Sequence, residues 1–221
     1  MIHFDSKNEL ESTLCKQIAA DLNVAIQQNG KATILLSGGS TPSGVYRLLS
    51  QETLDWSRIT IGLVDERFVA ADSPFSNFKL LRETIAQNQA RSVQILPMVV
   101  DPTNYEENLR KVEESYRIFT EPDVVLLGMG PDGHTASIFP NDTASEKANL
   151  KKETILSNTT APGEPTQRIT FNGPVLRNAK KLYLMITGIQ KKEIFENSEA
   201  NNLPIASFVS ALNQIYFTPA L

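Results

Sequence analysis

The chain has 221 residues, of which 41% are hydrophobic and 21% charged, and its formal net charge at pH 7 is −4. A chain of this size and composition can bury a substantial core, and we expect a single domain over residues 1–221. The acidic balance argues against nucleic acid as a partner, because nonspecific nucleic-acid binding needs a concentrated basic surface. A small anionic ligand is still compatible with it, since a few well-placed cations can hold one phosphate.

Cysteine content and hydrophobic patterning limit the chain further. Cys15 is the only cysteine, so no intramolecular disulfide can form, and two histidines do not complete a structural zinc site of the Cys/His type. The first residues lack the basic and apolar regions of a signal peptide. No apolar stretch approaches the roughly 20 residues that span a membrane. We therefore expect a cytoplasmic protein with no membrane partner.

The chain opens with a predicted helix and then alternates strands with helices. Ser6 and Glu9 have the spacing of a capping box, and apolar residues recur at every fourth position from Leu10 to Ile26. Gly30 is typical of a helix end. Further predicted helices cover 41–49, 77–87, 105–119 and 191–197. Short apolar runs predict strands at 32–36, 59–64, 93–96, 124–127, 154–157, 168–171, 182–186 and 214–217.

This alternation predicts crossover units and therefore an α/β fold with a mainly parallel sheet covered by helices. Sheets of this kind bind ligands in the crevice outside the carboxyl ends of their strands. The residues that carry chemistry should consequently follow the predicted strands directly. Three segments of this chain do so.

The first segment covers residues 37–42 and follows the predicted strand 32–36. Gly38 and Gly39 allow the backbone to approach a ligand closely, while the hydroxyls of Ser37 and Ser40 and the amides of a helix start can bind an anion. A tight turn before a capped helix is the alternative. No lysine stands at the Walker spacing, so an ATP-type phosphate loop is excluded.

The second segment is Asp65, Glu66 and Arg67, which follow the predicted strand 59–64. Two carboxylates beside an arginine can orient water, bind sugar hydroxyls or hold the arginine in place. A solvated cluster of surface charges is the alternative. The position at the end of a strand favours a site.

The third segment covers residues 128–139, after the predicted strand 124–127. Gly128, Gly130 and Gly133 match the letters of the dinucleotide-binding fingerprint. We reject that interpretation because Pro131 and Asp132 stand where the glycine turn should meet a pyrophosphate, and a carboxylate there would repel it. No strand ending in an acidic residue follows at the required distance of about 20 residues either.

Asp132 and His134 place a carboxylate and an imidazole in this glycine-rich loop. Histidine has an ordinary pKa of about 6.5, so its neutral form can take a proton from water. His3, near the N-terminus, has no such surroundings, and we expect a structural or exposed role. Arg168 begins a predicted strand and Lys191 a predicted helix; both are either ordinary surface cations or, at a helix start, phosphate ligands.

Taken together, these motifs resemble those of 6-phosphogluconolactonases. The resemblance covers nearly the whole chain, keeps the family's order, and is most specific in the glycine–aspartate–histidine segment. The matching segments are residues 37–42, 65–67, 76–77, 128–140, 165–170 and 188–192.

The resemblance implies a Rossmann-like fold with helices on both faces of the sheet, and hydrolysis of 6-phosphogluconolactone to 6-phosphogluconate in the oxidative pentose phosphate pathway. It implies no metal, no organic cofactor and no obligatory partner, hence a monomer. His134 would be the catalytic acid/base, Asp132 its partner and Arg67 the site arginine, with Arg168 and Lys191 at the phosphate. The expected substrate-binding residues also include Ser37, Gly38, Gly39, Ser40, Asp65, Glu66 and Asn77.

Two other functions compete with this one. The related glucosamine-6-phosphate deaminases share several of these motifs, but they usually carry an acidic residue where this chain has Phe139. A noncatalytic sensor of sugar phosphates would keep the fold and the pocket without the reaction. The intact set of Asp132, His134 and Arg67 favours the enzyme.

Overall fold

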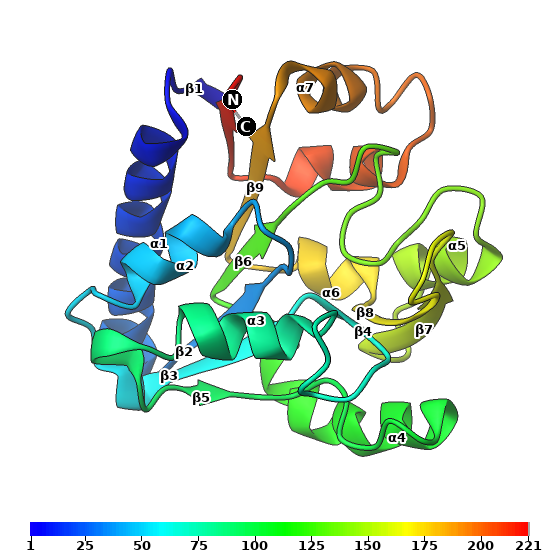
Figure 1. The fold of residues 1–221 in the computed structure, drawn as a ribbon, viewed down its shortest axis with the longest axis horizontal. Coiled ribbons are helices and arrows are strands. Elements are labelled where there is room, and N and C mark those ends of the chain that lie inside the picture. Colours follow the sequence, from blue (N-terminus) through cyan, green and yellow to red (C-terminus); the bar gives the residue numbers. More distant parts are fainter. Residues whose placement is uncertain (221) are drawn as a thin grey trace.

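A seven-stranded, fully parallel sheet forms the centre of the computed structural model, which describes residues 1–220 (Figure 1). The strands run in the order β1-β10-β9-β6-β2-β3-β5. The central strands are buried along their whole length, as expected for a sheet covered on both faces. The bounds are β1 Ile2–His3, β2 Ala32–Leu36, β3 Ile59–Leu63, β5 Gln94–Ile95, β6 Val124–Leu127, β9 Lys181–Thr187 and β10 Gln214–Thr218.

Helix α1, Lys7–Asn29, follows the predicted apolar stripe and its predicted ends. The side chain of Ser6 accepts a hydrogen bond from the backbone of Glu9 at 3.2 Å, and Gly30 adopts the left-handed conformation with φ of 75°. The residues of the stripe are buried, with none more than 9% exposed, so the helix packs its apolar face on the sheet.

The remaining helices lie on both sides of the sheet, as predicted. Helices α1, α2 and α3 pack against one another in chain order. The connections from β2 to β3 and from β3 to β5 run toward the β5 edge of the sheet. Those from β5 to β6 and from β6 to β9 run in the opposite direction, toward the β1 edge. Because parallel crossovers are right-handed, these connections lie on the opposite face. The bounds are α2 Ser43–Leu49, α3 Asn77–Thr84, α4 Tyr105–Tyr116, α6 Gly173–Arg177 and α7 Ile189–Glu196, with short 3₁₀ helices η1 Trp56–Arg58, η2 Asn88–Ala90, η3 Arg117–Phe119 and η4 Pro204–Ala211.

A second, antiparallel sheet stands beside the main one and has the order β4-β8-β7. Its strands are β4 Asp65–Arg67, β7 Leu156–Thr160 and β8 Gln167–Phe171, and helix α5 Thr143–Leu150 packs against β7. The two strands predicted at 154–157 and 168–171 therefore form a separate hairpin, and the first of them begins later than predicted. The charged segment after β3 is itself a strand of this sheet.

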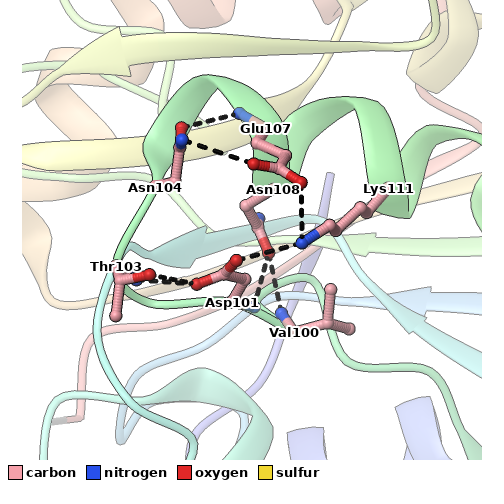
Figure 2. A network of polar contacts seen from close by, with 7 residues as sticks. All are labelled: Val100, Asp101, Thr103, Asn104, Glu107, Asn108 and Lys111. Atoms are coloured by element: carbon pink, nitrogen blue, oxygen red, sulfur yellow. Dashed lines mark hydrogen bonds and ion pairs between the residues drawn. The ribbon is translucent and has the colours of Figure 1, made fainter.

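The start of α4 is held by a polar network, which Figure 2 shows. Asn104 accepts the backbone N–H of Glu107 at 3.0 Å as a helix cap. Asn108 is fully buried, and its Oδ1 atom accepts two successive backbone N–H groups from the loop before the helix. Lys111 lies 3.0 Å from the carboxylates of both Asp101 and Glu107. The network anchors the loop that leads from β5 to this helix.

No helix within residues 1–220 is both long and apolar enough to cross a membrane.

Candidate active site

The loops after β2, β3, β6 and β9 converge at the carboxyl edge of the main sheet. Strands β2 and β6 are neighbours there, and the chain leaves them in opposite directions, which makes this the topological switch point. A cavity of about 260 Å³ opens at this point. It is lined by Ser37, Gly38, Gly39, Ser40, Thr41, Pro42, Asp65, Arg67, Asn77, Gly128, Met129, Gly130, His134, Ala136, Met185 and Lys191.

The loop after β2 is tied to the sheet by Ser37. Its hydroxyl donates to the carbonyl of Leu126 at 2.8 Å and accepts the N–H of Gly128 at 3.2 Å, so it joins the two loops of the switch point. Tyr46 donates to the carbonyl of Ser37 at 2.6 Å. The serine hydroxyl is thus occupied within the protein, and the cavity wall here is mostly backbone.

Gly38 is required by the close approach of Asn77. A Cβ atom at position 38 would lie 1.9 Å from Asn77 Oδ1, a distance that no side chain tolerates. The amide nitrogen of Asn77 in turn donates to the backbone carbonyl of Asp65 at 2.9 Å. Loops after two neighbouring strands are therefore locked together at the cavity.

Glu66 lies behind the cavity wall rather than on it. Its carboxylate is 1% exposed and accepts hydrogen bonds from the backbone N–H groups of Arg67, Asn77 and Phe78 and from the hydroxyl of Ser76. Burial raises the pKa of Glu66, although these four bonds act in the opposite direction. A carboxylate at the first turn of a helix also interacts favourably with the helix dipole, so Glu66 anchors the start of α3.

Arg67 lines the cavity. Arg168 is paired with Arg67 in the antiparallel register of β4 and β8. One guanidinium nitrogen of Arg67 donates to the carbonyl of Phe75 at 2.8 Å. The guanidinium of Arg168 donates to the carbonyl of Pro165. Burial and the neighbouring charge of Arg67 lower the pKa of Arg168. Among residues 1–220 no carboxylate lies within 4.0 Å of either guanidinium, although the charges of Asp65 and Glu66 act on Arg168 from a greater distance.

His134 and Asp132 are in direct contact, which cannot be read from the sequence alone. The Nδ1 atom of His134 lies 2.5 Å from Asp132 Oδ1, and that oxygen also accepts the backbone N–H of His134 at 3.2 Å. Burial raises the pKa of Asp132, but the hydrogen bond and charge of His134 outweigh it and hold that pKa below its ordinary value. Because Nδ1 is engaged, Nε2 is the ring nitrogen left for a proton from outside.

Two contacts fix the plane of the imidazole. The ring of Phe139 lies 4.7 Å from that of His134, centroid to centroid. On another side the backbone of Gly130 passes so close that a Cβ atom there would lie 2.1 Å from the ring. The side chain of His134 nevertheless remains 30% exposed, so a substrate in the cavity can reach it.

Lys191 approaches the cavity from the first turn of α7. Burial lowers its pKa, and no carboxylate among residues 1–220 lies within 4.0 Å of its ammonium group. The adjacent Lys192 differs, since it pairs with Glu196 at 2.5 Å along the same helix. A half-buried lysine without a counter-ion is suited to an anionic ligand.

Nine of the twelve residues predicted for the site line the cavity, and three stand behind it. Asp132, one of the three behind it, contacts His134. The other two are Glu66, which accepts hydrogen bonds from the start of α3, and Arg168, which pairs with Arg67 in the register of β4 and β8. Met185 lines the cavity but carried no signal in the sequence, because it lies in an apolar strand that is otherwise core. Within residues 1–220 no three His, Cys, Asp or Glu side chains are grouped so as to hold a metal ion.

Fold and site together define an α/β enzyme with a carboxylate–histidine pair, open to a small anionic molecule. Residues 5–216 match the model of the family described as glucosamine-6-phosphate isomerases/6-phosphogluconolactonase, and the chain belongs to this family. The 6-phosphogluconolactonase of Rhizobium meliloti is 35% identical over 227 residues, which cover 98% of this chain and 97% of that relative. The corresponding protein of Helicobacter pylori is 30% identical, with 92% and 88% covered.

Solved structures agree with this assignment. A 6-phosphogluconolactonase from Shewanella baltica is 33% identical and superposes with a TM-score of 0.90, covering 98% of this chain and 96% of the other. The 6-phosphogluconolactonase from Thermotoga maritima is 26% identical with a TM-score of 0.81, covering 98% and 97%.

Proposed function

We propose that this protein hydrolyses 6-phospho-D-glucono-1,5-lactone to 6-phospho-D-gluconate, the lactonase step of the pentose phosphate pathway, with His134 as general base. The observation that carries the proposal is the pair of Asp132 and His134 at the edge of a cavity that also holds Arg67 and Lys191. The relatives described above are named for this activity, and the chain matches them over most of their length.

Water is the nucleophile in this mechanism. Nε2 of neutral His134 takes a proton from water as its oxygen attacks the lactone carbonyl, and Asp132 stabilises the imidazolium that forms. The carbonyl electrons move to an oxyanion, which the guanidinium of Arg67 stabilises, with Arg168 adding to the positive field. The bond from the carbonyl carbon to the ring oxygen then breaks, and His134 returns its proton to that oxygen. Preorganised charge of this kind contributes a few kcal/mol to the transition state.

The phosphate binds at the opposite end, near Lys191. Its ammonium group and the backbone N–H groups of the loop 38–41 together form the anion site. The family resemblance implies that Arg168 lies with Lys191 at the phosphate. We instead assign Arg168 to the carbonyl end, because it neighbours Arg67 and does not line the cavity. Anchoring the remote phosphate fixes the carbonyl beside the attacking water and lowers the entropy cost of the reaction.

The test is the loss of freshly generated 6-phosphogluconolactone, measured against an enzyme-free blank because the lactone also opens spontaneously. His134→Ala should lower kcat by about 10²- to 10⁴-fold, the usual contribution of general acid–base catalysis. His3→Ala is the matched control, since this histidine lies in β1 and packs on Phe217. It should keep wild-type activity.

Each other result points elsewhere. Wild-type turnover in His134→Ala would leave the lactonase intact but remove His134 from the mechanism. Lactone loss no faster than the blank, with ammonia released from glucosamine 6-phosphate, would favour a deaminase. Binding of 6-phosphogluconate without either reaction would identify a sensor.

A further inference from the structure

Ser137 is a buried residue of the His134 loop that does not line the cavity, and it is only 1% exposed. Its hydroxyl donates a hydrogen bond to Oδ2 of Asp65. Its backbone N–H donates to the hydroxyl of Thr170 at 3.2 Å, and its carbonyl accepts the hydroxyl of Thr159 at 2.7 Å. Every polar group of Ser137 is therefore engaged, and three of these contacts reach the antiparallel sheet.

The backbone leading to Ser137 is also constrained. Ala136, which lines the cavity, has a φ of 52°, a left-handed conformation that costs free energy outside glycine. One residue earlier, Thr135 donates its hydroxyl to the carbonyl of Gly128 at 2.8 Å. These features fix the backbone between His134 and Ser137. The serine hydroxyl consequently points toward β4 and away from solvent.

The two carboxylate oxygens of Asp65 have different surroundings. Oδ2 is occupied by Ser137, whereas no group among residues 1–220 donates a hydrogen bond to Oδ1. Asp65 is 9% exposed and lines the cavity, so Oδ1 is the acceptor available to a ligand. A half-satisfied carboxylate in such a place accepts strongly from a hydroxyl group.

We propose that Ser137 is a positioning residue, which holds Oδ2 of Asp65 so that Oδ1 accepts a hydrogen bond from a sugar hydroxyl of the substrate. The inference rests on the proposed function and deepens it, since it names the group that recognises the polyhydroxylated part of the molecule. It also links the two walls of the cavity. The loop that carries His134 sets the orientation of a carboxylate on β4, 72 residues away in the chain.

The expected signature is a change in binding rather than in turnover. A hydroxyl contact made equally in the ground state and the transition state raises KM when it is lost, and kcat stays nearly constant. Ser137→Ala should therefore raise KM for the lactone about tenfold, the effect of losing one well-placed hydrogen bond to a charged group. The dissociation constant of 6-phosphogluconate, measured by calorimetry, should rise by a similar factor.

A double-mutant cycle with Asp65→Ala separates this role from a structural one. Because Ser137 acts through Asp65, Ser137→Ala should raise KM and the product dissociation constant less than twofold when Asp65 is already alanine. Ser50→Ala is the matched control: Ser50 is also fully buried, and its hydroxyl donates to the carbonyl of Arg47, away from the cavity. It should leave both constants unchanged.

Ser137→Cys keeps the inference testable if Ser137→Ala does not fold. The thiol has nearly the shape of the hydroxyl but donates weakly, so KM should again rise with kcat retained. A tenfold effect of Ser137→Ala that persists beside Asp65→Ala would overturn the inference, as would a loss confined to kcat or unchanged constants in both variants.

The inference and the proposed function can fail separately. Wild-type protein that binds 6-phosphogluconate but does not exceed the lactone blank removes the proposed activity, while the calorimetric cycle still decides the role of Ser137. Wild-type protein that binds no 6-phosphogluconate overturns both.

Discussion

Gly130→Ala should move the imidazole of His134 without unfolding the protein. A Cβ atom at this position would lie 2.1 Å from Cε1 of His134 and 2.8 Å from Oδ1 of Asp132. An ordinary contact begins at 3.4 Å, so the ring must move by about 1.3 Å, the difference between the two distances. A misplacement of about 1 Å can cost about 100-fold in rate. We therefore expect kcat to fall about 100-fold.

The folded state should tolerate the change better than the activity does. Gly130 does not have a positive φ, so alanine introduces no backbone strain. Replacing glycine also lowers the entropy of the unfolded chain, which contributes roughly 0.4–1 kcal/mol of stability and offsets part of the clash.

The assay is steady-state hydrolysis of fresh 6-phosphogluconolactone above the spontaneous rate, with thermal unfolding followed in parallel. Gly163→Ala is the control, because a Cβ atom there meets nothing within 4 Å, its φ is not positive and it does not line the cavity. A wild-type kcat in Gly130→Ala would refute the reasoning that the position of the ring determines turnover. An equal loss in Gly163→Ala would show that the clash is not the cause.

Two further predictions concern stability and pH. Asn108→Ala should lower the free energy of unfolding by roughly 3 kcal/mol, because it leaves two backbone N–H groups and the carbonyl of Met98 without their partner; a melting temperature within 2 °C of wild type would contradict this. Burial lowers the pKa of Lys191, so the charged form is a cost to the folded state. Lys191→Met should therefore raise the melting temperature at pH 7 while it weakens binding of 6-phosphogluconate. That gain is complete below the folded-state pKa and disappears as pH rises past the ordinary value of 10.5. Lys192→Met, whose lysine pairs with Glu196, should not show it.

Elements with a clear local pattern could be predicted from the sequence. The stripe of α1 and its capping residues Ser6 and Gly30 placed both helix ends correctly, since caps and periodicity act within a few residues. The apolar runs of β2 and β6 were predicted with their observed bounds. Short or polar elements were missed, among them β1, α5 and α6, because their formation depends on neighbours distant in the chain. The helix predicted over 77–87 ends at Thr84 for the same reason.

The candidate site was predictable as a set of loops, because parallel strands bring their carboxyl ends to one edge of the sheet. That rule, with the residue types, indicated Asp65, Arg67, His134 and Lys191, and all four line one cavity. The rule does not distinguish the cavity wall from the layer behind it. Glu66 was predicted to bind substrate, but it does not line the cavity and accepts hydrogen bonds at the start of α3. Neither burial nor hydrogen-bond partners can be read from three adjacent charges.

The sequence by itself determined the elements with strong periodicity, the parallel α/β class and the loops that supply most of the cavity lining. Only the tertiary structure decided that β4, β7 and β8 form a separate sheet. It also decided that Asp132 contacts Nδ1 of His134 and that Ser137 donates a hydrogen bond to Asp65. The physical reason is the range of the forces involved. Helix periodicity and capping act between near neighbours in the chain, whereas strand pairing and buried hydrogen bonds join residues that are far apart in sequence and meet only when the core packs.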